Sequence, residues 1–379
     1  MDALPELPES LDLRTELVPA VRALLRRGLT DSFMRQCVRI GEFAGYAGGL
    51  KADLVGGLTL NVDAVMKLGG SELPAHALLM NAVNASAPGT FAEVLEILPL
   101  ERGRWLLLMA QLRKYETLFD RVYTRPSRQG ELESAVDKTL AGLRACHRLT
   151  AAAASSGLPE TIDPFTPRIR SKLEAALAQE PALALMLENP GKVQGRCCPP
   201  LTDLLGELER WLGHTLPMVP RVLVHGDPHL RNVMVRPYGK GLAVRFIDPN
   251  PDYGYTDPAY DFGKLLHFAE AVGWALARPQ ACRARWATRQ GEWTLSAQLS
   301  DAPDAAETRR AFLEAEIRQR CAGLPYATAA SWPARLHVAR ASAHLGLLAR
   351  FPGAESAAAR RFVLAHALAA LAEWHAASR

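Results

Sequence analysis

The chain has 379 residues and a mass of 41.3 kDa, which suffices for about two or three lobes of ordinary size. Its composition, 49 % apolar and 22 % charged, is that of a folded globular protein and excludes collagen-like, low-complexity and largely disordered chains. The net charge of +4 comes from dispersed basic residues without any Lys/Arg block, so we expect no nucleic-acid partner.

The sequence also bears on cellular location. No apolar run approaches the roughly 20 residues that cross a bilayer, and the densest one, residues 105–110, is followed at once by polar and charged side chains. The N-terminal segment 1–14 is acidic and contains prolines, whereas a secretory signal is basic and then apolar. The six cysteines show neither C-x-x-C spacing nor a histidine at a zinc-ligand interval. We therefore expect a cytoplasmic protein without a membrane partner, a disulfide framework or a zinc site.

After a helix expected at 11–29, the first part of the chain consists of short β-favouring runs that glycines separate. Their residue patterns predict strands at 37–43, 51–55, 58–68, 91–100 and 104–112. A helix is expected between the third and the fourth of these strands, at about 74–83. The pattern predicts a small lobe, residues 1–112, with five antiparallel strands and one inserted helix.

Residues 113–379 show a mostly helical pattern, most clearly at 132–149 and in the alanine-rich segment 334–375. Short strands around tight turns interrupt this pattern at 221–227, 232–237 and 243–248. Residues 150–200, rich in Ala, Pro and Ser, have the weakest pattern and are interpreted as a helical insert. The whole chain is therefore expected to be α+β, with the small lobe followed by a larger, mainly helical lobe at 113–379.

The segments VLVHGDPHLRNVMV and VRFIDPNP hold the most informative set of polar residues. Asp227 follows a strand, Asn232 comes five residues later, and Asp248 ends the next hairpin strand. Phosphoryl transfer needs a carboxylate that orients the acceptor hydroxyl and takes its proton, together with oxygen ligands for Mg²⁺. Asp227 fits the first role, and Asn232 and Asp248 fit the second. His229 is interpreted as a solvent-facing loop residue, with a place facing the substrate as the alternative.

The pattern H-G-D-x-x-x-x-N followed by I-D resembles the aminoglycoside phosphotransferase and choline kinase family, which shares the protein-kinase fold. The later DPAYDFGKLLH, residues 257–267, is similar to that family's G-x-x-x-x-D-x-A-x-D segment. The resemblance covers about residues 35–270, and the remainder matches only in being helical. It implies a two-lobed kinase that uses Mg²⁺ and ATP or GTP to phosphorylate a hydroxyl of an antibiotic, sugar or amino-alcohol type of small molecule.

The resemblance also assigns supporting roles. Asp261 matches the aspartate that supports the catalytic loop, residues 225–232, and His225 is expected to support the same loop rather than to transfer a proton. Met109 and Gln111 lie in the segment that resembles the hinge between the lobes, and we expect them to bind the nucleotide.

Lys67 lies near the end of the third predicted strand and is one of only eight lysines in the chain. A strand in this place directs an ammonium group at the α- and β-phosphates, as the corresponding kinase lysine does. The usual partner of that lysine is a glutamate on the following helix, but residues 75–84 contain no acidic residue. Glu72 is the candidate partner, and it fits a helix-capping role equally well.

A glycine-rich loop, AGYAGG at 44–49, lies between the first two predicted strands. Gly45, Gly48 and Gly49 fit a hairpin turn and, equally, a backbone cover over the nucleotide phosphates, which a kinase-like fold places here.

The charge of the predicted substrate region bears on the acceptor. Residues 265–379 contain nine acids and fourteen Lys or Arg, whereas a polycationic aminoglycoside needs an acidic cleft. A neutral or anionic hydroxylated metabolite, or a less cationic antibiotic, fits this composition at least as well. A local acidic wall remains an alternative, with these candidates: Asp301, Asp304, Glu307, Glu314 and Glu316.

Two other functions remain open at this point. One is a protein Ser/Thr kinase on the same fold, although no A-P-E segment follows Asp248 and His-Gly-Asp stands in place of H-R-D. The other is a non-catalytic nucleotide-binding protein. This interpretation is suggested by the lack of an acidic residue at 75–84, which leaves Glu72 as the candidate partner of Lys67.

Overall fold

The protein is described here by a computed structural model, which places residues 50–53, 64–99, 103–110, 112, 114–149, 157–300, 304–351, 353 and 356–379. The predicted helix at 11–29, the first predicted strand at 37–43 and the glycine-rich loop at 44–49 lie outside the described residues.

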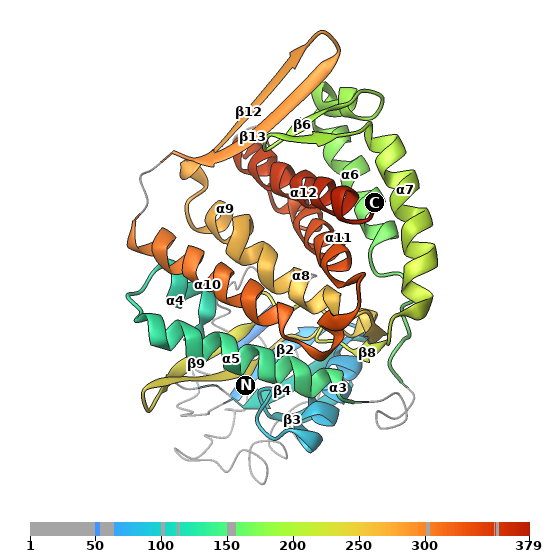
Figure 1. Ribbon diagram of the computed structural model, residues 1–379. Coiled ribbons are helices and arrows are strands. Elements are labelled where there is room, and N and C mark those ends of the chain that lie inside the picture. The colour runs from blue at the N-terminus through green and yellow to red at the C-terminus, as the bar shows by residue number, and fades with distance from the viewer. Residues whose placement is uncertain are drawn as a thin grey trace, which may run out of the picture.

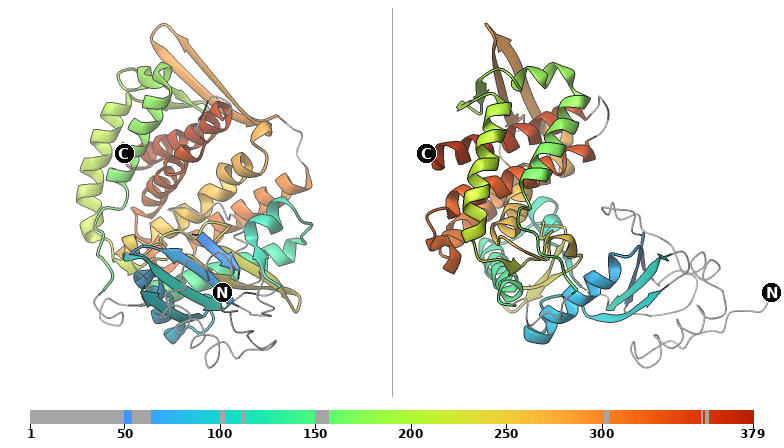
Figure 2. Two further views of the ribbon diagram at one scale, coloured as in Figure 1. Left: turned by 180° about the vertical axis from the view of Figure 1, so that it is seen from behind. Right: turned by 90° about the vertical axis from the view of Figure 1, so that its right-hand side faces the viewer.

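A four-stranded antiparallel sheet and one helix form one end of the molecule (Figure 1; Figure 2, right). The strands follow the order β1 (Leu50–Asp53), β2 (Ala64–Gly69), β4 (Trp105–Ala110) and β3 (Val94–Pro99). Helix α3 (Leu73–Ser86) has a proline in its first turn and packs against β3 and β4 through buried side chains such as Met80 and Val83. Four of the predicted strands and the inserted helix are therefore confirmed, and the first predicted strand, at 37–43, stays a prediction.

The predicted strands within residues 221–248 form a hairpin and a short strand pair. They are β9 (Val233–Tyr238) and β10 (Gly241–Phe246), whose sheet β5 (Glu116–Thr117) extends, and β8 (Val222–Leu223), which pairs with β11 (Tyr255–Thr256). Backbone hydrogen bonds join the end of β10 to the segment before β3, from Ala92 N to Phe246 O at 3.0 Å and from Phe246 N to Thr90 O at 2.8 Å. The residues that follow β10 are thereby held beside the four-stranded sheet.

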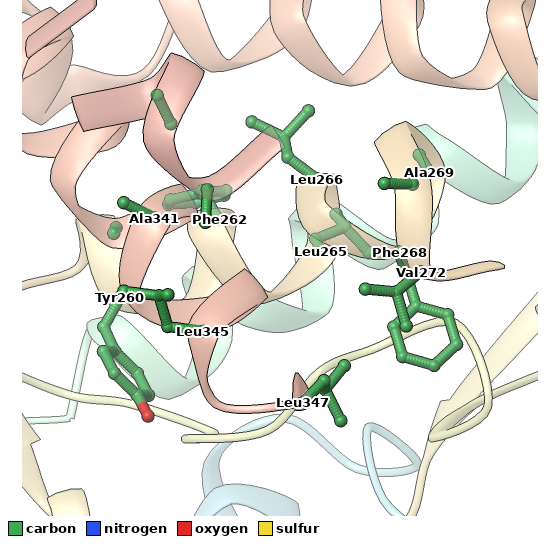
Figure 3. Close-up of a cluster of buried hydrophobic side chains, with 14 of the residues drawn as sticks. Tyr260, Phe262, Leu265, Leu266, Phe268, Ala269, Val272, Ala341, Leu345 and Leu347 are labelled. Atoms are coloured by element: carbon green, nitrogen blue, oxygen red, sulfur yellow. The ribbon is translucent and has the colours of Figure 1, made fainter. Parts of the chain in front are cut away.

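Helices make up most of the chain after β4 (Figure 1). They are α4 (Leu118–Tyr123), α5 (Gln129–His147), α6 (Thr166–Gln179), α7 (Leu201–Thr215), α8 (Ala259–His267), α9 (Gly273–Ala277), α10 (Ala305–Ala322), α11 (Trp332–Leu345) and α12 (Ala357–Ala377). Helix α8 is buried along its whole length and packs against α10 and α11. A π-helical turn, Phe268–Val272, joins α8 to α9, and its apolar side chains belong to the same buried cluster as Leu345 and Leu347 (Figure 3). Within the described ranges no helix has the length and apolarity needed to cross a bilayer.

The expectation that the chain beyond about residue 270 is only helical is wrong. Strands β12 (Cys282–Arg289) and β13 (Glu292–Leu299) form a long hairpin that projects from the helices (Figure 1). Its turn residues, Gln290 and Gly291, both have positive φ, at 52° and 81°, which is the geometry of a two-residue hairpin turn. Strand β13 also pairs with β6 (Gly191–Val193), which pairs with β7 (Arg196–Cys198), so the predicted helical insert at 150–200 contains two strands besides α6.

Candidate active site

The loop between β8 and β9 is held by one buried carboxylate. Asp261 lies in the first turn of α8, and its two oxygens accept hydrogen bonds from the backbone N–H groups of His225 and Gly226, both at 2.9 Å. His147, the last residue of α5, places its Nε2 atom 3.0 Å from the same carboxylate. Two helices that are distant in sequence therefore fix this loop through Asp261.

The loop also requires a glycine at its bend. Gly226 has a φ of +81°, which non-glycine residues rarely adopt. A Cβ atom at this position would lie 2.3 Å from the carbonyl oxygen of Asn250, far inside van der Waals contact. The backbone N–H of Asn250 donates to the His225 carbonyl at 2.7 Å, which keeps the two loop segments at this close distance.

His225 is fully buried and packs against aromatic rings. Its ring stacks on Phe91 at 5.3 Å and meets the ring of Phe246 edge-on at 5.2 Å. Burial lowers the pKa of His225, although nearby carboxylates act in the opposite direction, so the ring is neutral at pH 7. Its Nδ1 atom accepts a hydrogen bond from the backbone N–H of Asp227 at 3.2 Å, which orients the residue that follows.

Asp227 combines a partly exposed carboxylate with a cationic neighbour. The Nζ atom of Lys264, from α8, lies 3.1 Å from Asp227 Oδ1, and the carboxylate is 18 % exposed. Burial by itself would raise the pKa of Asp227, but the Lys264 ammonium outweighs it and holds this pKa well below the ordinary value. The carboxylate is therefore ionised at neutral pH and can accept a hydrogen bond from a hydroxyl group.

The expectation that His229 faces solvent is wrong. The residue is 5 % exposed, and its ring stacks on Phe268 at 4.7 Å. Its Nε2 atom lies 3.5 Å from Asp227 Oδ2, and burial lowers its pKa to about 4. His229 is therefore a neutral wall of the site beside Asp227, because the π-helical turn that supplies Phe268 covers it.

Asn232 and Asp248 meet where the loop and the end of β10 come together. The Asn232 amide nitrogen donates to the backbone carbonyls of Asp227 at 3.0 Å and of Asp248 at 3.5 Å, so the Oδ1 oxygen of the same amide is turned away from these two carbonyls. Asp248 precedes a proline and has a φ of +52°, an unusual conformation for a residue other than glycine. An amide oxygen and a carboxylate at one place are the hard oxygen ligands that Mg²⁺ prefers, so this pair fits the predicted metal.

Lys67, in β2, reaches this place from the four-stranded sheet. Its Nζ atom lies 3.4 Å from Asp248 Oδ1 and 3.4 Å from Nδ1 of His76 in α3. Glu72 makes a local contact instead, since its Oε1 atom accepts a hydrogen bond from the backbone N–H of Gly70 at 2.9 Å. Among the residues that the structure describes, no ion pair joins Lys67 to Glu72.

His76 was missed from the sequence because the usual partner of such a lysine is an acidic residue. His76 is the only ionisable side chain between residues 73 and 86, and that was the available signal. Burial, together with the charge of Lys67, lowers the pKa of His76 to about 4. At neutral pH the ring is uncharged and can accept a hydrogen bond from the Lys67 ammonium through Nδ1.

Lys264 was missed as well. Lysines are scarce in this chain, and Lys264 interrupts an apolar run in α8, so the same scarcity that singled out Lys67 applied to it.

Of the other residues expected to bind the nucleotide, Met109 is buried in β4, where it pairs with Val65 of β2. Gln111 and the glycines of the 44–49 loop, Gly45, Gly48 and Gly49, lie outside the described residues.

The proposed acidic wall does not form from the described candidates, because arginines neutralise each of them. Asp304 pairs with Arg278, and Glu307 and Glu314 both pair with Arg310. Glu316 likewise pairs with Arg320, and Asp301 lies outside the described residues. These carboxylates consequently offer little net negative charge to a cationic ligand.

Comparisons with known proteins give one family and one fold. Residues 92–299, more than half of the chain, match the model of the phosphotransferase enzyme family, and no curated protein matches the chain. A thermostable mutant of aminoglycoside phosphotransferase APH(4)-Ia, in its apo form, is 16 % identical and has a TM-score of 0.50 over 87 % of this chain and 94 % of its own. This likeness confirms the predicted protein-kinase-like fold.

Two further solved structures are less similar. The GDP and kanamycin complex of APH(2″)-IIIa is 13 % identical, with a TM-score of 0.47 over 92 % of this chain and 98 % of its own. The ethanolamine kinase of Plasmodium vivax is 10 % identical, with a TM-score of 0.40 over 98 % of this chain and 90 % of its own.

Proposed function

The chain belongs to the phosphotransferase enzyme family, and we propose that it is a small-molecule kinase, which transfers the γ-phosphoryl group of ATP or GTP to a hydroxyl group of its substrate. One observation supports this proposal above the others. The structure brings Lys67, Asn232 and Asp248 together next to Asp227, although Lys67 and Asp248 are 181 positions apart in sequence. The predicted location in the cytoplasm, without nucleic acid or a membrane as partner, is part of the same proposal.

Asp227 acts on the acceptor. Its ionised carboxylate accepts a hydrogen bond from the substrate hydroxyl and holds that oxygen in line with the γ-phosphorus. As the new O–P bond forms and the bond from the γ-phosphorus to the β-phosphate oxygen breaks, the hydroxyl proton passes to Asp227, and the nucleoside diphosphate leaves. The low pKa of Asp227 keeps the carboxylate ready for this transfer at neutral pH.

Lys67, Asn232 and Asp248 act on the nucleotide. The Lys67 ammonium offers hydrogen bonds to the phosphate oxygens, and the neutral His76 ring keeps it in place without cancelling its charge. Asn232 Oδ1 and the Asp248 carboxylate would hold the Mg²⁺ that accompanies the nucleotide, and this cation would supply positive charge to neutralise the phosphates. Catalysis then depends on positioning and on charge stabilisation rather than on a covalent enzyme intermediate.

The test is a thermal-shift measurement with Mg²⁺ and each nucleoside triphosphate, on the wild type and on Asp248→Ala. A ligand at 100 times its Kd stabilises the folded state by about 2.7 kcal/mol, so a magnesium-dependent shift is expected in the wild type and not in the variant. Asp252→Ala, a change at an exposed aspartate in the same segment, is the control and should keep the shift. If no nucleotide shifts the wild type, the proposed function is wrong.

A further inference from the structure

Helix α8 brings a buried lysine into contact with the proposed base. Lys264 lies three residues after Asp261, one turn further along the helix, and its side chain is only 8 % exposed. Its Nζ atom is 3.1 Å from Asp227 Oδ1, and among the described residues this is the carboxylate with which it forms an ion pair. A buried ammonium group needs such a counter-charge, because desolvation makes an unpaired one costly.

A second cation, Arg168 of α6, points to the same region and forms no ion pair with any described residue. Its guanidinium donates to the hydroxyl oxygen of Tyr253 at 3.0 Å and to the backbone carbonyl of Ser342 at 3.3 Å. Both acceptors are neutral, and the ion pairs within the described ranges include none for Arg168. Gly346 leaves the necessary space, since a Cβ atom there would overlap the guanidinium.

Two tyrosines connect these cations. The ring of Tyr260 lies 5.8 Å from the Lys264 ammonium, and it packs on the ring of Tyr253 with the ring centres 4.3 Å apart. Figure 3 shows Tyr260 at the edge of the apolar cluster of α8, with its hydroxyl oxygen directed away from that cluster. Lys264, Tyr260, Tyr253 and Arg168 thus form a continuous cationic wall that begins at Asp227.

Among the described residues, the charges of this wall do not balance. Lys264 and Arg168 contribute two positive charges, and Asp227 contributes one negative charge. Asp227 must also bind the acceptor hydroxyl if the proposed function is correct. A ligand that brings a second anionic group would pair with the cations and leave Asp227 to the hydroxyl, whereas a polycation would be repelled.

We infer that the acceptor is an anionic hydroxylated small molecule, whose carboxylate or phosphate group binds Arg168 and Lys264 while its hydroxyl faces Asp227. This inference rests on the proposed function, and it names the substrate class of the same site. Arg168 is its specificity-determining residue, because a guanidinium held by neutral partners keeps its full charge and its remaining N–H donors for an anion.

The test is a panel of matched acceptors with Mg²⁺ and the preferred nucleotide. Each set has a neutral, a carboxylated, a phosphorylated and an amino member: glycerol, glycerate, glycerol phosphate and serinol, then glucose, gluconate, glucose 6-phosphate and glucosamine, with kanamycin as the polycation. We expect a carboxylated or phosphorylated member to exceed its neutral partner in kcat/KM by about 10–100-fold, the worth of a charge-assisted hydrogen bond. The two anionic arms distinguish a carboxylate from a phosphate as the recognised group.

Substitutions at two positions of α6 then test the role of Arg168. Arg168→Gln should raise KM for the anionic acceptor by about 10-fold or more while the Kd of the nucleotide stays the same, and Arg168→Lys should recover part of the loss. Arg170→Gln removes an exposed arginine of the same helix, which pairs with Glu209, and should leave KM unchanged.

Three results would overturn the inference: turnover confined to neutral or cationic acceptors, no turnover on any anionic member by a protein that binds the nucleotide, or an equal KM change for neutral and anionic acceptors in Arg168→Gln. Each of them leaves the proposed function standing, because nucleotide binding is measured separately. A wild type that binds no nucleotide with Mg²⁺ would instead remove the proposed function and this inference together.

Discussion

The backbone N–H of Gly226 lies 2.9 Å from Oδ1 of Asp261, and this hydrogen bond joins the loop of the proposed base to the first turn of the central helix α8. The same helix supplies Lys264, which contacts Asp227. One rigid element therefore positions both the backbone of the loop and the charge beside its carboxylate. Changes at the Gly226 bend should consequently affect chemistry more than they affect global stability.

We predict that Gly226→Ala lowers kcat by at least about 10²-fold, because the new methyl group collides with the Asn250 carbonyl and displaces the proposed base from its position. Gly239→Ala is the matched control. Gly239 also has a positive φ, but a Cβ atom there meets no other atom within 4 Å, so only backbone strain of about 1 kcal/mol is expected. Steady-state rates and thermal unfolding of both variants make the comparison. Equal kcat values in the two variants would contradict the steric argument.

Asp227→Asn should lower kcat by about 10²–10⁴-fold, the usual effect of losing a general base, while nucleotide binding persists. The reason is that an amide can still accept a hydrogen bond from the acceptor hydroxyl but takes its proton poorly. Single-turnover rates and a nucleotide-binding isotherm separate the two effects. Asp252→Asn, at an exposed position nearby, should retain both. A variant at position 227 with near-normal turnover would show that another group accepts the proton.

The parts of the site that the sequence predicted are those in which chemistry and local structure coincide. Asp227 and Asn232 lie in one short loop, and Asp248 follows the next hairpin, so spacing alone brings them together once the strands are recognised. The hairpin could be predicted because alternating residues and a glycine turn specify it locally.

The residues that were missed come from helices whose contacts depend on packing. Lys264 meets Asp227 across 37 positions of sequence, and Arg168 approaches from another helix altogether. No local pattern sets such distances, since they follow from how α6, α8 and α11 pack. The β12–β13 hairpin is a different case. Its strand pattern and its Gln290-Gly291 turn were present in the sequence, but the resemblance to the family led us to expect only helices in this part of the chain.

A pH-dependent prediction concerns stability far from the site. Glu373 of α12 pairs with Arg196 at 2.9 Å, with Arg340 at 2.8 Å and with His337 at 3.1 Å. Burial alone would raise the pKa of Glu373, but His337 and Arg340 lower it to about 2. Since the folded-state pKa is below the ordinary value of 4.5, the stabilisation is present above about pH 4.5 and is lost as the pH falls toward about 2.

Glu373→Gln should therefore lower the free energy of unfolding by about 1–3 kcal/mol at pH 7, and its difference from the wild type should shrink as the pH falls from 4.5 to 3. Urea unfolding at pH 7, 4.5 and 3 measures this difference. Glu292→Gln, a change at an exposed glutamate of β13, should cost little at any of these pH values. A difference that stays constant with pH would mean that the contacts of Glu373 contribute through packing rather than charge.

The last prediction concerns His76, the neutral partner of Lys67. His76→Ala removes the acceptor at 3.4 Å and leaves Asp248 as the remaining described partner of the Lys67 ammonium, so the ammonium is drawn toward the proposed metal ligand and away from the phosphates. We expect the Kd of the nucleotide with Mg²⁺ to rise by about 3–10-fold, the net worth of one ordinary hydrogen bond. Calorimetric titration of the purified variant measures this change.

Two controls make the His76 experiment specific. His76→Asn keeps an acceptor atom near the position of Nδ1 and should recover most of the affinity, whereas Asn81→Ala changes an exposed residue of the same helix and should leave the Kd as in the wild type. If His76→Asn binds as weakly as His76→Ala, the ring acts by filling space in α3. If both bind like the wild type, Asp248 alone positions Lys67, and the histidine has no part in holding the nucleotide.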